Sequence, residues 1–220
     1  YKTKGVLMDE EAAADANLIM YNAEGLPVAF GPGDIHFDDH YEDGIIDEKD
    51  RQIIGDPNPD FYGSFTNRLI YKNFTFEACF TFSYGNDVYN YLRRNLESGK
   101  DFMNQTTSVL ARWRTEGQQT DQPRAVYLDP MGNSRFSDRW IEDGSYLRLK
   151  TLSINYAIPY RGDIIEGLTV WVAANNIWTL TNYLGPDPEV SINNSVLYQG
   201  IDTGLLPIGR SYFIGIKLNL

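Results

Sequence analysis

Five stretches of the chain alternate between apolar side chains and polar or small ones. The clearest is 209–220, where one side of the pattern carries Tyr212, Ile214, Ile216, Leu218 and Leu220. The other side carries Phe213, Gly215, Lys217 and Asn219. Because successive side chains of a strand point to opposite faces, this period of two predicts a strand with one apolar face. The same pattern predicts strands at 61–71, 74–84, 145–158 and 168–179.

Two local features refine these strands. Only Lys72 and Asn73 separate the first two strands, which predicts a tight hairpin. In the third strand, Leu147 and Leu149 fall on the opposite parity from Leu152 and Ile154. An extra residue in one strand produces such a change of parity, so we predict a β-bulge near Lys150.

The connections between the predicted strands alternate in length. The long ones are 34–59, 85–144 and 182–209, and the short ones lie at 72–73 and 159–167. Outer-membrane barrels have short periplasmic turns and long extracellular loops. The alternation therefore favours a barrel wall whose three long segments are extracellular. A soluble sandwich with its long loops at one end is the alternative.

We therefore expect an all-β fold, in which about five antiparallel strands form part of a transmembrane β-barrel with long extracellular loops. The predicted organisation is an extracellular loop region at 1–60, followed by barrel strands and extracellular loops at 61–220. Alanine-rich sequence at 10–20 predicts a short helix. Further helical pieces are expected around 88–96 and 107–113.

Composition excludes several classes of protein. A net charge of −11 leaves no basic stripe to neutralise phosphates, so nucleic acid is not an expected partner. No apolar run approaches the roughly 18 residues that a membrane-spanning helix needs. The single cysteine, Cys79, makes neither an internal disulfide nor a cysteine-based zinc site. The chain begins at Tyr1 without a signal peptide, and we expect a mature fragment or a piece of something longer.

The segment 39–50 has the spacing of an EF-hand-type calcium loop. Such loops supply oxygens at positions 1, 3, 5, 7, 9 and 12, with glycine at position 6. The matching residues are Asp39, Asp43, the backbone carbonyl of Ile45, Asp47 and Asp50, with Gly44 at the turn. Tyr41 stands at the third position, where Asp or Asn is usual, so a solvated acidic turn is the alternative. Calcium bound here would stiffen an extracellular loop and would not catalyse.

No catalytic residue is predicted, and the chain is not expected to be an enzyme. The pairs Glu142/Asp143 and Asp187/Glu189 have the chemistry of a glycosidase dyad. With thirty acidic residues in the chain, chance pairs are expected, and solvated loop acids are the favoured interpretation. The sequence also lacks a nucleophile elbow.

Several aromatic side chains invite a functional interpretation. In the longest loop these are Trp113, Tyr127, Phe136 and Trp140. Exposed aromatics stack on sugar rings or meet partner proteins, but a loop of this length also needs a small core of its own, which is the favoured interpretation. Parity places Trp171 on the lumen side, and Trp178 near the outer end of its strand is typical of an interfacial girdle.

A series of short motifs occurs in the order found in one family of transporters. The motifs are Gly33-Asp-Ile35, Asp43-Gly-Ile-Ile-Asp47, Asp50-Arg51, Ile54-Gly-Asp-Pro-Asn-Pro59, Ser83-Tyr-Gly-Asn-Asp-Val-Tyr-Asn90, Arg112-Trp113, Asp121-Gln-Pro-Arg124, Ser137-Asp-Arg139, Glu142-Asp-Gly-Ser-Tyr-Leu-Arg-Leu-Lys150, Asn175-Asn-Ile-Trp-Thr179, Tyr183, Asp187-Pro-Glu-Val190 and the closing strand. As an ordered series covering nearly the whole chain, they resemble the C-terminal region of SusC/RagA-like TonB-dependent transporters of Bacteroidetes outer membranes.

The resemblance implies a fold, a location and partners. It implies strands of a large, plugged barrel in the bacterial outer membrane, in contact with lipid. It also implies import of an oligosaccharide or peptide, a SusD-like lipoprotein on the extracellular face, and TonB acting through an N-terminal part that these residues do not include. The alternative is a secreted, soluble all-β carbohydrate-binding module stabilised by calcium. A glycoside hydrolase is a third and minor alternative.

Overall fold

The computed structural model of the chain describes residues 1–159, 165–189 and 198–219. By their contacts, the residues form two compact units. Unit 1 comprises Tyr1–Asp56, Tyr89–Glu142 and Ile201–Gly204, and unit 2 comprises Pro57–Val88, Asp143–Gly200 and Leu205–Leu220. Both units combine stretches that are far apart in the sequence, whereas the division predicted at residue 60 follows the chain.

The first part of unit 1 is a small α/β arrangement around an apolar core. Strand β1 (Thr3–Val6) pairs antiparallel with β4 (Ile35–Phe37), and β2 (Ile19–Tyr21) pairs with β3 (Pro27–Ala29). The helix α1 (Glu10–Ala16) connects β1 to β2. Together these elements bury the side chains of Leu7, Ala13, Leu18, Phe30, Ile35, Phe37, Ile46 and Met131.

Helix α1 is shorter than the helix predicted at 10–20. The Asp9 side chain caps its start by accepting a hydrogen bond from the Ala12 backbone N–H, and Asn17 ends it in the left-handed conformation with φ of 46°. The next residues, Ile19–Tyr21, pair with β3 instead of continuing the helix. Tertiary pairing therefore overrides the local helical preference.

The remaining elements of unit 1 are short. They are η1 (Glu48–Asp50), α2 (Tyr91–Glu97), η2 (Thr107–Ala111), η3 (Asp138–Trp140), β8 (Ile141–Asp143) and β11 (Ile201–Asp202), with β11 running parallel to β7 (Asp87–Asn90). Helical structure thus occurs near both places predicted in the longest loop. Within the described ranges, no helix is both long and apolar enough to cross a membrane.

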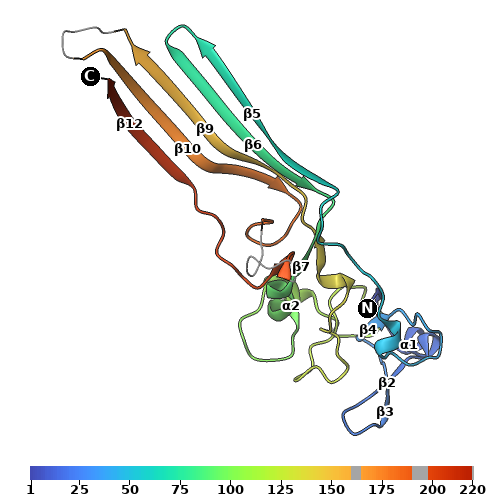
Figure 1. Cartoon of the computed structure of the whole chain (residues 1–220). Helices are drawn as coiled ribbons and strands as arrows, with labels where there is room; N and C mark the ends of the chain where they lie inside the picture. Colours follow the sequence, from blue (N-terminus) through green and yellow to red (C-terminus); the bar gives the residue numbers. More distant parts are fainter. Residues whose placement is uncertain (160–164, 190–197, 220) are drawn as a thin grey trace. The chain divides into compact units, whose positions relative to one another are not determined.

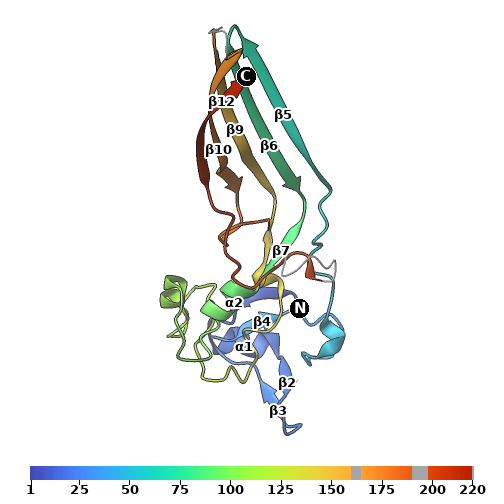
Figure 2. The same cartoon turned by 60° about the vertical axis from the view of Figure 1, so that its left-hand side comes forward.

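Unit 2 is built on one five-stranded antiparallel sheet, whose strands lie side by side in Figures 1 and 2. Its order is β12 (Ser211–Asn219), β10 (Gly167–Thr181), β9 (Tyr146–Ile158), β6 (Phe74–Tyr84) and β5 (Phe61–Tyr71). The prediction of five antiparallel strands is confirmed, and the β5–β6 hairpin has the predicted two-residue turn. Within the described residues of unit 2, no second sheet accompanies this one.

The bulge predicted near Lys150 is present. Thr151 lies opposite Cys79 and Asn175, whereas Leu149 lies opposite Phe80 and Trp178, so Lys150 falls where both registers shift. The bulge turns the leucines of the upper half of β9 back to the side of Leu152. An apolar row therefore continues along the whole strand despite the change in sequence parity.

Candidate functional site

One side of the five-stranded sheet, here called the apolar face, carries almost only apolar side chains. Cross-strand partners share a face of a sheet, so the register defines its members. They are Phe61, Phe65, Leu69 and Tyr71 of β5; Phe74, Phe76, Ala78, Phe80, Phe82 and Tyr84 of β6; Leu147, Leu149, Leu152, Ile154, Tyr156 and Ile158 of β9; Leu168, Val170, Val172, Ala174, Trp178 and Leu180 of β10; and Tyr212, Ile214, Ile216 and Leu218 of β12. Gly63 and Asn67 of β5 also lie on it.

The apolar face is largely exposed on this chain. Ile214 is 78% exposed, Ile216 68% and Phe65 59%. A soluble monomer rarely leaves a contiguous apolar surface of this extent uncovered. The strands are 9 to 15 residues long, and a strand that crosses the hydrocarbon core of a bilayer needs about 9–11. Lipid is therefore a suitable covering for this face.

The opposite side, here called the polar face, carries mainly small and polar side chains. It includes Thr75, Glu77, Thr81, Ser83, Tyr146, Arg148, Asn155, Thr169, Trp171, Asn175, Ser211, Gly215 and Lys217. Trp171 lies on it, on the side predicted for the lumen, while Trp178 lies on the apolar face. The Trp171 ring covers Gly215, where an added Cβ would come within 2.6 Å of the ring, so glycine is needed at this position.

Arg148 binds the segment after β10 to the polar face, through a group of side chains here called the Arg148 cluster (Arg148, Thr179, Asp187 and Glu189). Its guanidinium forms an ion pair with Asp187 and donates hydrogen bonds to Glu189 at 3.0 Å and to the Thr179 hydroxyl at 3.0 Å. Arg148 is 2% exposed and Asp187 is 6% exposed. Asp187 also accepts hydrogen bonds from the backbone N–H groups of Glu189 and Ile208. A cluster so strongly hydrogen-bonded fixes the path of the chain beside the sheet.

A cavity of about 710 Å³ lies in unit 2. Tyr62, Thr81, Ser83 and Tyr146 of the polar face line it, as does Glu189 of the Arg148 cluster. The Thr81 hydroxyl is buried without a hydrogen-bond partner. Hydroxyls, phenols and a carboxylate can bind polar solutes. Sequence reasoning did not find this cavity, because its walls come from strands and loops that are distant in the sequence.

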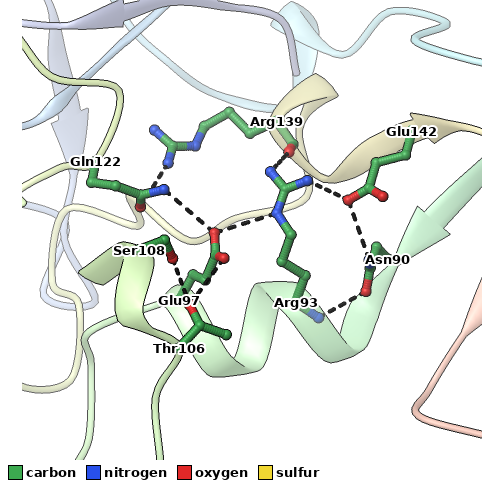
Figure 3. Close-up of polar contacts among 8 residues, drawn as sticks. All are labelled: Asn90, Arg93, Glu97, Thr106, Ser108, Gln122, Arg139 and Glu142. Atoms are coloured by element: carbon green, nitrogen blue, oxygen red, sulfur yellow. Dashed lines mark hydrogen bonds and ion pairs between the residues drawn. The ribbon is translucent and has the colours of Figure 1, made fainter. Parts of the chain in front are cut away.

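In unit 1, a polar network joins helix α2 to η3 and β8 (Figure 3). Arg93 lies at its centre, forming ion pairs with Glu142 and with Glu97, the latter at 3.3 Å. Arg93 also donates to the backbone oxygen of Arg139 at 2.6 Å. Burial, followed by the neighbouring Arg93 cation, lowers the pKa of Arg139 to about 10. The network therefore stabilises the packing of α2 against η3 and β8.

A second buried network lies at Asp34, which is fully buried. Arg124 donates two hydrogen bonds to its carboxylate, at 2.8 and 2.7 Å, and the Asn133 amide donates a third at 2.9 Å. Two motifs of the ordered series, at 33–35 and 121–124, thus meet in space. The same holds for Arg148 and Asp187, which belong to the motifs at 142–150 and 187–190.

The arginine networks include three of the four acids with the chemistry of a glycosidase dyad. Glu142 pairs with Arg93, while Asp187 and Glu189 pair with Arg148. A carboxylate held by an arginine has a structural role that accounts for its position. The structure therefore supplies no observation in favour of a hydrolase.

The predicted calcium ligands lie in one loop, and most of their oxygens accept hydrogen bonds within the protein. Fully buried Asp50 accepts from the N–H groups of His40, Tyr41 and Asp47. Asp47 accepts from the Lys49 N–H, and Asp43 accepts from the Ile45 N–H and from the Lys49 ammonium group.

Asp39 differs from these acids. Its Oδ2 accepts from the Gly44 N–H, but its Oδ1 is buried without a partner. No group of three or more His, Cys, Asp or Glu side chains that could hold a metal ion occurs in the described part of the chain. Calcium binding stays a prediction.

The aromatic residues of the longest loop have different environments. Trp140 is 1% exposed, and the Trp113 indole N–H donates to the backbone oxygen of Met8 at 2.9 Å. These two serve packing, as favoured from the sequence. Tyr127 and Phe136 remain 61% and 48% exposed.

Comparison with other sequences identifies relatives, although no family model matches the chain. The chain is 35% identical over 195 residues to TonB-dependent receptor P3 of Formosa agariphila, covering 85% of this chain and 19% of the relative. It is 27% identical over 207 residues to TonB-dependent receptor SusC of Bacteroides thetaiotaomicron, covering 90% and 18%. The chain thus spans about a fifth of the length of the curated relatives it matches.

Solved structures show the same fold. A structure of the RagAB peptide transporter aligns with a TM-score of 0.64 and 26% identity, over 76% of this chain and 18% of that chain. A structure of the RagAB peptide importer in its closed-closed state aligns with a TM-score of 0.69 and 22% identity, over 99% and 22%. The second likeness concerns the fold alone.

Proposed function

Because this chain is homologous to TonB-dependent receptors, SusC among them, we propose that its sheet forms part of the wall of an outer-membrane importer. The resemblance found in the sequence is confirmed, as is the all-β fold with five antiparallel strands. The observation that supports the proposal most directly is the exposed apolar face. It would contact lipid, while the polar face would line the lumen.

Cargo and partners belong to the same proposal. The importer would take up an oligosaccharide or a peptide together with a SusD-like surface lipoprotein, with TonB acting through a part of the receptor outside these residues. The relatives are receptors and transporters and not enzymes, which supports a role without catalysis. Co-purification of a lipoprotein with the receptor from outer membranes would test the partner, and its absence at stoichiometric level would count against it.

Single-cysteine labelling in whole cells tests the membrane wall. On a Cys79→Ser background, cysteines would replace Phe65 and Ile216 of the apolar face and their neighbours Ser64 and Lys217 of the polar face. All four positions are exposed on this chain, so burial within these residues does not limit the access of either reagent. We expect a membrane-soluble thiol probe to label positions 65 and 216, and a charged reagent to reach only 64 and 217.

The opposite outcome is equally informative. If the charged reagent reaches all four cysteines equally, the sheet faces water on both sides. That result would reject the barrel wall and favour the secreted carbohydrate-binding module. Gly215 is unsuitable for labelling, because a side chain there would meet the Trp171 ring.

Calcium binding by the loop at 39–50 is proposed as a stabilising feature, supported by its spacing and by the unpartnered Oδ1 of Asp39. A ligand that binds only the folded state raises the thermal midpoint. We expect millimolar calcium to raise the midpoint of the receptor in detergent relative to a chelator. An Asp39→Asn variant should lose that rise, whereas a Glu24→Gln variant outside the loop should keep it. An equal midpoint with calcium and with chelator would rule the site out.

A further inference from the structure

A cavity of about 600 Å³ in unit 1 is dominated by arginine. Its lining residues are Tyr1, Arg51, Gln52, Arg94, Arg135 and Phe136. No carboxylate is among them, in a chain whose net charge is −11. Pockets that enclose small ligands have volumes of about 300–1,000 Å³, so the size suits a small molecule. Three guanidinium groups around one such space indicate an anionic ligand.

Arg135 is a partly buried cation that forms no ion pair in the described part of the chain. In the described part of the chain, no carboxylate lies within ion-pair distance of it, and its N–H groups donate to the backbone oxygens of Met131 at 2.7 Å and Gly132 at 3.0 Å. Its guanidinium lies over the rings of Phe37 at 4.6 Å and Tyr1 at 5.3 Å. Burial lowers the pKa of Arg135. Burying a charge is costly, although the aromatic faces and the Asp129 carboxylate, which lies beyond ion-pair distance, offset part of that cost.

Arg94 and Arg51 add two further positive charges to the lining of the cavity. Arg94 donates its Nε–H to the backbone oxygen of Ser134 at 2.6 Å and lies over the Tyr91 ring at 5.7 Å, again with no ion pair in the described ranges. Arg51 contacts Glu48 at 2.7 Å, with side chains 60% and 80% exposed. An ion pair so exposed contributes little, and a ligand can compete for it. Guanidinium groups carry five N–H donors each, so donors remain for a ligand.

We propose that this cavity binds the carboxylate group of a small organic ligand, with the guanidinium groups of Arg94 and Arg51 donating hydrogen bonds to its oxygens and Arg135 adding positive charge beside them. Arginine matches a carboxylate with two parallel hydrogen bonds. The Tyr1 ring and half-exposed Phe136 supply an apolar wall for the ring or carbon skeleton next to the carboxylate. The carboxylate can belong to a uronic acid sugar or to the end of a peptide. Its identity as cargo rests on the proposed import function, while the binding site itself does not.

Calorimetry on the full-length receptor in detergent tests the proposal. The probes are glucuronate and N-acetyl-phenylalanine, each paired with a neutral analogue, glucose and N-acetyl-phenylalanine amide. We expect at least one carboxylate to bind and its neutral partner not to bind, with affinity falling as salt rises. The probe that binds distinguishes the sugar source from the peptide source.

Three variants locate the site. Arg94→Gln should weaken binding at least about tenfold, as expected on removing a hydrogen bond to a charged group, and Arg51→Gln should weaken it in the same direction. Arg51 is exposed, so its variant keeps the test valid even if Arg94→Gln disturbs folding. Arg114→Gln, at an exposed arginine of the same unit outside the cavity, should leave affinity unchanged.

Failure of this proposal is separable from failure of the import function. Equal binding of neutral and charged probes, no binding of either carboxylate, or full affinity in both Arg51→Gln and Arg94→Gln would overturn the carboxylate site. Such a result would leave the cysteine-labelling outcome untouched. Conversely, carboxylate binding in a protein whose sheet is water-accessible on both faces would keep the site and reject the membrane wall.

Discussion

Replacing Arg148 by methionine should destabilise the protein by about 3–5 kcal/mol, the cost of breaking a buried ion pair by removing one partner. Arg148 is almost fully buried and holds both Asp187 and Glu189. Without the guanidinium, the Asp187 carboxylate keeps only its backbone N–H donors in a buried position. The measurement is the denaturant midpoint of the full-length receptor in detergent, followed by tryptophan fluorescence.

Lys150→Met is the matched control for this variant. Lys150 also approaches Glu189, at 3.8 Å, but the two side chains in that contact are 39% and 40% exposed. Exposed pairs contribute about 0–1 kcal/mol, so the control should change stability little. Arg148→Lys should fall between the two, because an ammonium group keeps the charge but loses the planar fork. If Arg148→Met and the control have the same denaturant midpoint, the Arg148 cluster does not hold the segment after β10 in place.

Replacing Ile154 by arginine should reduce stable insertion by about 2–4 kcal/mol, the cost of an arginine on the lipid face near the middle of a bilayer. Ile154 lies on the apolar face of the central strand β9, opposite Val172 and Phe76, and is 40% exposed. If this face met water, the same exchange at an exposed position would change stability by only about 0.5 kcal/mol. The measurement is folding into lipid vesicles across a urea series.

Ser153→Arg is the control, one residue away on the polar face. Ser153 lies opposite Glu77, so an arginine there meets a carboxylate in the proposed lumen. We expect Ser153→Arg to insert as well as the parent. Equal insertion of the two arginine variants, whether both are retained or both are lost, would contradict a lipid-facing apolar face.

What the sequence determined by itself is the part of the structure that depends on neighbours along the chain. Alternation of side chains locates each strand and divides its residues between two faces, since the period of a strand is local. The change of parity between Leu149 and Leu152 was enough to locate the bulge at Lys150, which the pairing of β9 with β6 and β10 confirms. The ordered motifs likewise identified the relatives.

Only the tertiary structure decided which distant groups meet. Asp34 binds Arg124 across 90 positions, and Arg148 binds Asp187 across 39. The arginine cavity draws its walls from residues near 1, 51, 94 and 135. In the sequence these residues look like ordinary solvated charges, because an ion pair is specific only after the chain has folded and removed both groups from water. Local periodicity therefore predicted the strands of the sheet and their two faces. Long-range packing created the Arg148 cluster and the arginine-lined cavity of unit 1.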